Sequence, residues 1–178
     1  GELIKVNWQG TLSKLKVTQL DNLASKVLQL NKQNQWLLVG SDALTLFDVD
    51  KFSIIRNHQI ESKIIDAQLF PDRSGVVFMK QNQQGRSLSV INLNDFEMPY
   101  SIPTEKGLSN FVINPNANSV LVINTRGLFE QIHLSTIAKL PVPFALRNIP
   151  GASRLLMATQ DRIYFEDIEG WQVVSENG

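Results

Sequence analysis

The sequence predicts an all-β protein built from several antiparallel sheets of four strands each. Apolar segments of four to seven residues alternate with polar turns, and the segments are rich in Val, Ile, Leu and Phe. This pattern reads most clearly from Ile64 to Asp95, as IIDAQLF, PDRSG, VVFMK, QNQQGR, SLSVINL and ND. Helical spacing occurs only at Leu20, Leu23 and Val27. That stretch is as compatible with a loop as with a short helix, because about twelve residues rarely hold a helix without tertiary support.

The pattern recurs at a regular spacing. It also starts at Ser25, Leu108 and Phe144. Its first turns begin near Asn31, Pro71, Pro115 and Pro150. These turns lie 40, 44 and 35 residues apart, near the period of propeller blades. The sequence therefore predicts a β-propeller-like array of about four to five four-stranded antiparallel blades.

The repeats divide one predicted domain, residues 1–178, into blades and a remainder. The expected boundaries are a half blade at 1–19 and full blades at 25–57, 63–103, 107–143 and 144–178. The half blade lacks two strands, and the last strand, from Gln172, is already used by its own blade. We therefore expect an incomplete ring. An open ring leaves an unpaired strand edge, which is a template for association, so the expected partner is a second copy, another protein or the remainder of a longer chain.

Strand composition predicts which strands lie inside. VLVIN at 120–124 and SLSVINL at 87–93 are apolar runs bounded by Asn, Gly or Ser. Such runs are typical of strands buried on both faces between neighbouring sheets. FSIIRNHQI, from Phe52, is more polar and is expected to be an outer strand.

FPDRSGVVFMKQNQQGRSLSVINLND resembles the repeat of TolB-type and WD40-like propellers. In that repeat a Ser/Pro-Asp-Gly turn separates the first two strands, and the third strand ends in an Asp-bearing turn. The matching residues here are Pro71, Asp72 and Gly75 in the first turn and Asn94 and Asp95 in the second. FDVD, at 47–50, stands where a WD40 blade carries Trp-Asp, and the literal Trp-Asp and Gly-His pairs are missing. The resemblance implies the fold and leaves activity open.

Composition excludes several classes of function. Seventeen basic and seventeen acidic residues cancel, so no overall field attracts nucleic acid, and no nucleic-acid partner is expected. Cysteine is absent, which excludes disulfides, zinc-thiolate sites and thiol nucleophiles. The longest apolar runs, such as WLLV and VLVI, are far below the roughly 18 residues of a membrane helix, so this segment is not expected to insert into a membrane.

Signatures of catalysis are missing from the sequence. It contains no glycine-rich phosphate loop, no G-x-S-x-G elbow, no HExxH and no calcium loop. The acids at the ends of strands, such as Asp48, Asp95 and Asp167, are predicted to be turn residues that accept backbone N–H groups. No catalytic, cofactor or metal residue is therefore expected. The alternative is a hydrolase or lyase with a channel-centred acid or metal site, which would need residues such as Asp72, His58, His133 and Asp161 to converge.

Candidate interaction residues come from the turns. Arg73, Arg126, Arg147 and Arg162 lie in or beside turns, where guanidinium groups suit carboxylate or phosphate recognition. Trp8 and Trp171 each lie close to a turn glycine and are expected to be exposed, whereas Trp36 opens an apolar strand and is expected in the core. The predicted interaction surface is Trp8, Trp171, Arg73, Arg126 and Arg162, since aromatic and arginine side chains are enriched at binding hot spots.

These observations predict a non-catalytic propeller module that binds a protein or senses a ligand within a larger bacterial-type protein. The chain begins with Gly1 rather than Met, which agrees with a domain of a longer protein. One concrete form is the extracytoplasmic domain of a transporter permease or sensor. A cytosolic scaffold is the other.

Overall fold

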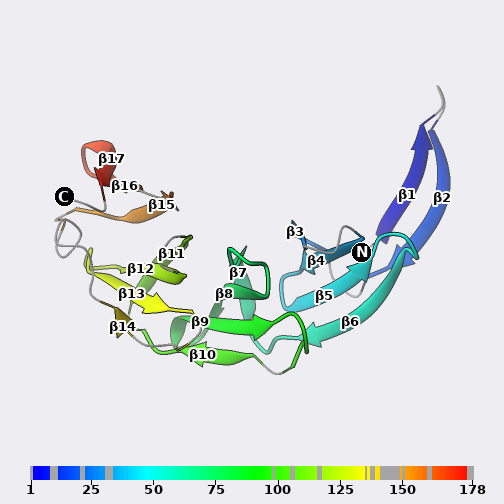
Figure 1. Ribbon diagram of the computed structural model, residues 1–178, viewed down its shortest axis with the longest axis horizontal. Coiled ribbons are helices and arrows are strands. Elements are labelled where there is room, and N and C mark those ends of the chain that lie inside the picture. Colours follow the sequence, from blue (N-terminus) through cyan, green and yellow to red (C-terminus); the bar gives the residue numbers. More distant parts are fainter. Residues whose placement is uncertain are drawn as a thin grey trace. The chain divides into compact units, whose positions relative to one another are not determined.

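The computed structural model describes most of the chain. The described residues are 2–8, 12–20, 23–30, 34–97, 99–104, 107–115, 118–134, 136, 139–140, 149, 151–159 and 162–175, and of residues 6–8, 12–17 and 139–140 the backbone alone is described. All regular structure in these ranges is β-strand, in antiparallel sheets of two to four strands (Figure 1). This confirms the predicted all-β class. Around Leu20 and Leu23 the described residues are not helical.

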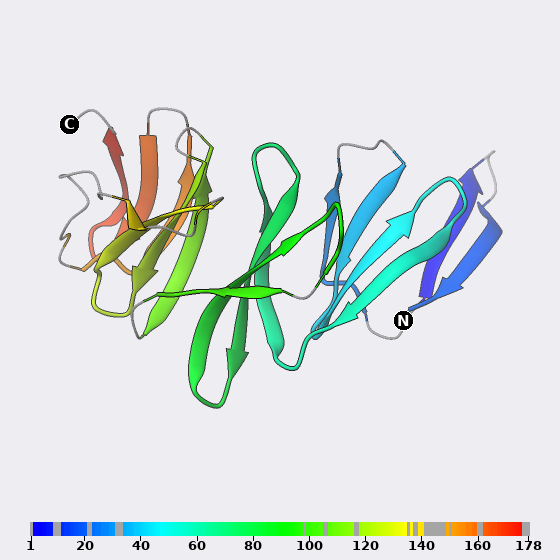
Figure 2. The same cartoon turned by 60° about the horizontal axis from the view of Figure 1, so that its bottom comes forward.

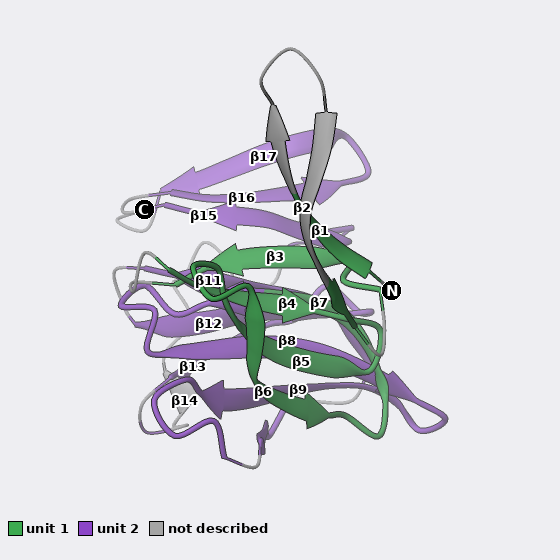
Figure 3. Cartoon of the chain, turned by 90° about the vertical axis from the view of Figure 1, so that its right-hand side faces the viewer, with its two compact units in different colours: residues 1–67 green, residues 68–178 purple. Residues whose placement is uncertain are grey.

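The chain divides into two compact units, residues 1–67 and 68–178, and the boundary falls inside strand β7 (Figure 3). In the first unit, β1 (Glu2–Trp8) and β2 (Leu12–Gln19) form a hairpin. The next sheet is a meander of β3 (Lys26–Gln29), β4 (Gln35–Val39), β5 (Ala43–Asp48) and β6 (Ser53–Gln59).

The core of the first unit gathers around two aromatic rings. Phe47 and Phe52 meet edge to face, with ring centroids 5.2 Å apart and planes at 87°, a favoured aromatic geometry. Leu20 and Leu38 complete the buried cluster, and Trp36, half-buried, packs against it. β6 is exposed along most of its length, as the composition of FSIIRNHQI predicts for an outer strand.

The second unit carries the remaining sheets, each again a meander (Figure 2). One sheet contains β7 (Lys63–Leu69), β8 (Gly75–Asn82), β9 (Gly85–Asn92) and β10 (Tyr100–Ile102). The next contains β11 (Leu108–Asn114), β12 (Ser119–Asn124), β13 (Phe129–His133) and β14 (Lys139–Leu140). The described part of the last contains β15 (Arg154–Ala158), β16 (Arg162–Asp167) and β17 (Gly170–Ser175). FALRNI, the predicted first strand of this blade, lies mostly outside the described residues.

The β11–β14 sheet is covered on both faces. Val120 and Val122 belong to a cluster with side chains of β8 and β9. Leu121 and Ile123, which point to the opposite face of the same strand, belong to a cluster with side chains of β15 and β16. Every residue of β12 is buried. This explains why VLVIN is apolar without alternation and confirms that it is buried on both faces.

Strand ends are closed by a recurring turn in which a side-chain oxygen accepts a backbone N–H. Asp72, Asn82, Asn92, Asp95, Asn124 and Asp167 each accept from the backbone nitrogen two residues later, at 2.8 to 3.2 Å. Asp48 accepts from the Lys51 nitrogen at 2.9 Å. These bonds confirm the predicted role of Asp48, Asp95 and Asp167. They also explain why Asp and Asn recur where strands end.

Candidate interaction surface

Large exposed apolar side chains gather on one face of the β15–β17 sheet. Met157 lies directly opposite Tyr164, and Tyr164 lies opposite Val173, so the three side chains form one row across the sheet. Trp171 lies two residues before Val173 and faces the same side. Trp171 is 81% exposed, Val173 51% and Met157 50%. We call Met157, Tyr164, Val173 and Trp171 the open face.

The reverse face of this sheet is part of the core. Leu155, Ile163 and Phe165 are buried there against the β11–β14 sheet. Phe165 meets Phe129 edge to face, with ring centroids 6.2 Å apart. Burial along β17 alternates strictly between half-buried and exposed. The sheet is therefore covered on one side, and its open face is the side that no described residue covers.

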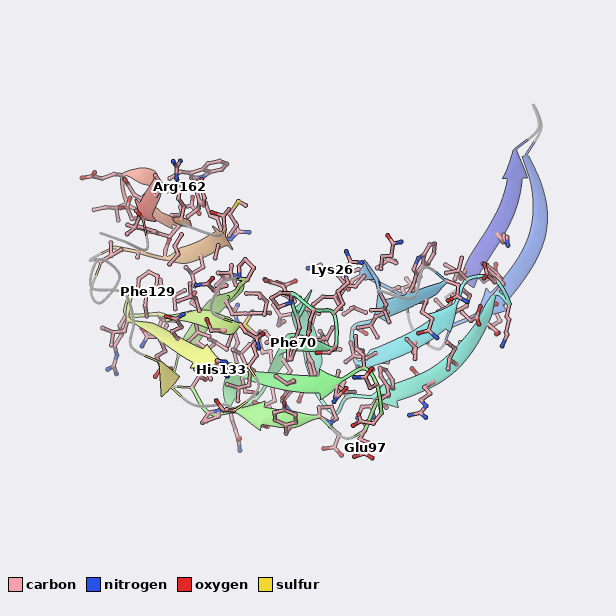
Figure 4. All side chains as sticks on the ribbon, viewed as in Figure 1. Lys26, Phe70, Glu97, Phe129, His133 and Arg162 are labelled. Carbon is pink, nitrogen blue, oxygen red and sulfur yellow. The ribbon has the colours of Figure 1, made fainter. Side chains whose placement is uncertain are left out.

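The open face is bordered by charges of both signs. Arg154 lies opposite Glu166, and Glu166 lies opposite Trp171. Arg162, labelled in Figure 4, opens β16 and lies opposite Ser175. Because residues 162, 164 and 166 alternate with the buried Ile163 and Phe165, all three point to the open side. An apolar centre with a charged border is the composition of protein-binding surfaces.

A two-residue turn fixes the register that builds the open face. Asp167 pairs with Gly170, and the Asp167 side chain accepts from the Glu169 nitrogen at 2.8 Å. Gly170 has a φ of 117°, a backbone conformation that glycine adopts without steric cost. The turn between β8 and β9 uses the same device at Asn82 and Gly85. Because loop length sets hairpin register, this turn places Val173 beside Tyr164.

Two of the predicted interaction residues lie on the same side of this sheet. Trp171 and Arg162 share its open side, whereas Arg73 and Arg126 lie in turns of the β7–β10 and β11–β14 sheets. Arg73 has a φ of 56°, and its nitrogen donates to the Phe70 carbonyl at 2.9 Å. The side chain of Trp8, and Arg147 as a whole, lie outside the described residues.

Arg126 lines a shallow hollow in the second unit. The hollow has a volume of about 350 Å³ and lies between the β12–β13 turn and the turn that precedes β15. Its lining residues are Ser109, Asn124, Thr125, Arg126, Gly127, Gly151, Ala152 and Ser153. None of these is acidic. A β-carbon on Gly127 would lie 3.1 Å from the Ile149 carbonyl oxygen, so glycine is what allows the two turns to approach each other.

Two residues of the enzyme alternative, Asp72 and His133, have local hydrogen-bonding partners. The backbone N–H and hydroxyl of Ser74 hydrogen-bond Asp72 and lower the pKa of its carboxyl group. The His133 Nδ1 lies 3.2 Å from the Thr136 hydroxyl. Asp161 lies outside the described residues. Within the described residues no group of three or more His, Cys, Asp or Glu side chains has a geometry suited to a metal ion.

Met157, Tyr164 and Val173 were missed by sequence reasoning. Their signal was present: the turn DIEG sets the pairing of IYFED with WQVVS, and alternation then places Tyr164, Trp171 and Val173 on one side. Met157 was harder to find, because the β15–β16 register shifts between Leu155 and Met157. An irregularity of this kind leaves no mark on the hydrophobic pattern.

Comparison with known proteins assigns this chain to no family. No family model matches the chain, and no curated protein matches it. Among the described residues there is no helix whose length and apolar character would let it cross a membrane.

Proposed function

We propose that this chain is a non-catalytic protein-interaction module of the β-propeller type and that its binding surface is the open face. One observation carries the proposal. Three large apolar side chains, Met157, Val173 and Trp171, are each at least half exposed on one side of a sheet whose reverse side is core. A contiguous exposed apolar group with a polar border is typical of a surface that binds another protein.

The propeller part of the proposal is supported by how the sheets of the second unit stack. Each is a meander, and the β11–β14 sheet packs face to face with a neighbour on either side. The first strands are joined by side chains: Gln68 accepts from the Ile113 nitrogen at 3.1 Å and donates to the Phe111 carbonyl at 3.2 Å. Stacked four-stranded meanders are the construction of propellers, and the repeats resemble TolB-type and WD40-like blades. We further propose that the module belongs to a larger bacterial-type protein, as the extracytoplasmic domain of a transporter permease or sensor.

Site-specific photo-crosslinking in cells tests the binding surface. A benzophenone amino acid is placed at Trp171 and, as a control, at Gln83, an exposed residue of the β8–β9 turn. We expect protein adducts from position 171 that position 83 does not give. Adducts from both positions at equal yield, or from neither, would contradict the proposal.

Ligand sensing is a second candidate function, and the hollow beside Arg126 favours it. Its volume of about 350 Å³ reaches the range of small-molecule sites. Its lining offers one guanidinium, several hydroxyls and no carboxylate, so a small carboxylate is the matching ligand class. Thermal unfolding with and without citrate tests it. Stabilisation that is lost in Arg126→Gln and kept in Arg73→Gln would support sensing, and no stabilisation would remove it.

A further inference from the structure

The last strand of each sheet after the β1–β2 hairpin is an edge, and β17 differs from β6, β10 and β14. β10 has three residues between Pro99 and Pro103, and β14 has two residues followed by Pro141. β6 carries Arg56 and pairs with β5 through a register shift. Short length, proline, charge and bulges are the devices that keep strand edges from pairing with other chains. β17 has none of them: GWQVVS is six residues long, uncharged and free of proline, and it pairs with β16 without a shift.

The backbone of β17 presents hydrogen-bonding groups along its outer edge. The Glu166 carbonyl accepts from the Ser153 nitrogen, so it points toward β15 and away from β17. Its cross-strand neighbour Trp171 is then at a position whose N–H and C=O point away from β16, and alternation gives Val173 the same orientation. No described strand lies beyond β17 in its sheet.

The strand is complementary to itself about Val173. When two β17 strands pair antiparallel with Val173 opposite the second copy's Val173, both valines exchange their outward N–H and C=O groups. Trp171 of each copy then lies beside the small Ser175 of the other. The row Met157, Tyr164 and Val173 continues without a break into the same row of the second copy. No charged residue opposes a like charge in the strand pair.

We propose that a second copy of this chain binds at the outer edge of β17 by antiparallel pairing of β17 with β17, with the two-fold axis at Val173. The inference rests on the proposed function, since the pairing extends the open face across both copies. An isologous contact of this kind closes at two copies. It joins two open faces into one apolar surface and gives the outward N–H and C=O groups of Val173 a partner in both copies.

Analytical ultracentrifugation over a concentration series tests the pairing. We expect a mass that rises with concentration from the 20.0 kDa of one chain toward twice that value. Val173→Lys places two lysines opposite each other across the axis, with Cβ atoms about 5 Å apart, and like charges in this position are destabilising. Because the Val–Val contact is lost and a like-charge pair is gained, we expect it to raise the midpoint concentration of dimerisation about two- to thirtyfold. Val173→Asp is expected to do the same.

Mixing the two variants gives the decisive result. Across the axis, Lys of one copy faces Asp of the other. An equimolar mixture of the two variants is therefore expected to dimerise at concentrations at which neither variant dimerises alone. Val27→Lys is the matched control, because Val27 is also a valine that is 51% exposed on a strand of another sheet. It is expected to leave the midpoint unchanged. Circular dichroism and melting temperature verify that each variant is folded.

The outcomes separate this inference from the proposed function. A wild-type chain that stays monomeric, or a dimer that responds equally to the changes at Val27 and Val173, overturns the β17 pairing. Crosslinks from position 171 to a different protein would then leave the proposed function standing. Crosslinks to a second copy, together with recovery in the mixture, support both.

Discussion

Strands β12 and β17 have the same length and different surroundings. In β12 all six residues, SVLVIN, are buried, because sheets cover both of its faces. In β17 the residues of GWQVVS alternate between half-buried and exposed, because one face alone is covered. The comparison teaches that an uninterrupted apolar run indicates two covered faces, whereas alternation between half-buried and exposed residues indicates that one face alone is covered.

The largest expected effect tests the covered side of this comparison. Leu121 is fully buried, so Leu121→Ala removes packing and leaves a cavity, and we expect a loss of about 2–5 kcal/mol in the free energy of unfolding. Val173→Ala, at a half-exposed site, is expected to change it by less than about 1 kcal/mol. Urea unfolding of the two variants measures the difference. Equal losses would mean that the two strands do not differ in burial.

A smaller effect is expected at the first-strand edge of the β11–β14 sheet. Gln68→Ala removes the amide oxygen that accepts from the Ile113 nitrogen and the amide N–H that donates to the Phe111 carbonyl. We expect a loss of about 1–3 kcal/mol, because a part-buried N–H is left without its acceptor. The backbone at this edge is thus satisfied by a side chain.

Gln68→Glu is the matched control for this change. The carboxylate keeps an acceptor for the Ile113 nitrogen and loses the donor to the Phe111 carbonyl. We expect a loss between those of wild type and Gln68→Ala, measured by the same urea titrations. A Gln68→Ala variant as stable as wild type would show that the bridge contributes nothing to this edge.

The sequence allowed prediction of features that depend on near neighbours along the chain. Alternation, apolar runs and Asp or Asn before turns led to the all-β class, to the burial of VLVIN on both faces and to the turn role of Asp167, because each depends on a few consecutive residues. The exposure of Trp171 followed from its place beside a turn glycine.

Features that depend on several strands at once could not be predicted in the same way. The open face needs the pairing of three strands and a register shift in β15, and the hollow beside Arg126 needs two turns from different sheets to approach each other. Neither leaves a local pattern. Closure of the sheets into a ring likewise depends on contacts beyond any one repeat.

The smallest expected effect concerns the turn between β7 and β8. The Ser74 N–H and hydroxyl lower the pKa of Asp72 below its ordinary value of 3.8. The ionised carboxylate therefore adds stability above about pH 4, and this contribution is lost as the pH falls through the lowered pKa.

Asp72→Asn keeps an oxygen that accepts from the Ser74 nitrogen and lacks the charge. Urea unfolding at pH 7 and pH 2.5 should show a small loss for the variant at pH 7 and a smaller difference at pH 2.5. Because Asp72 is exposed, solvent screening limits the effect to less than that of Gln68→Ala. If the difference in the free energy of unfolding between variant and wild type were larger at pH 2.5 than at pH 7, the argument would be wrong. Such a result would mean that folding raises the pKa of Asp72.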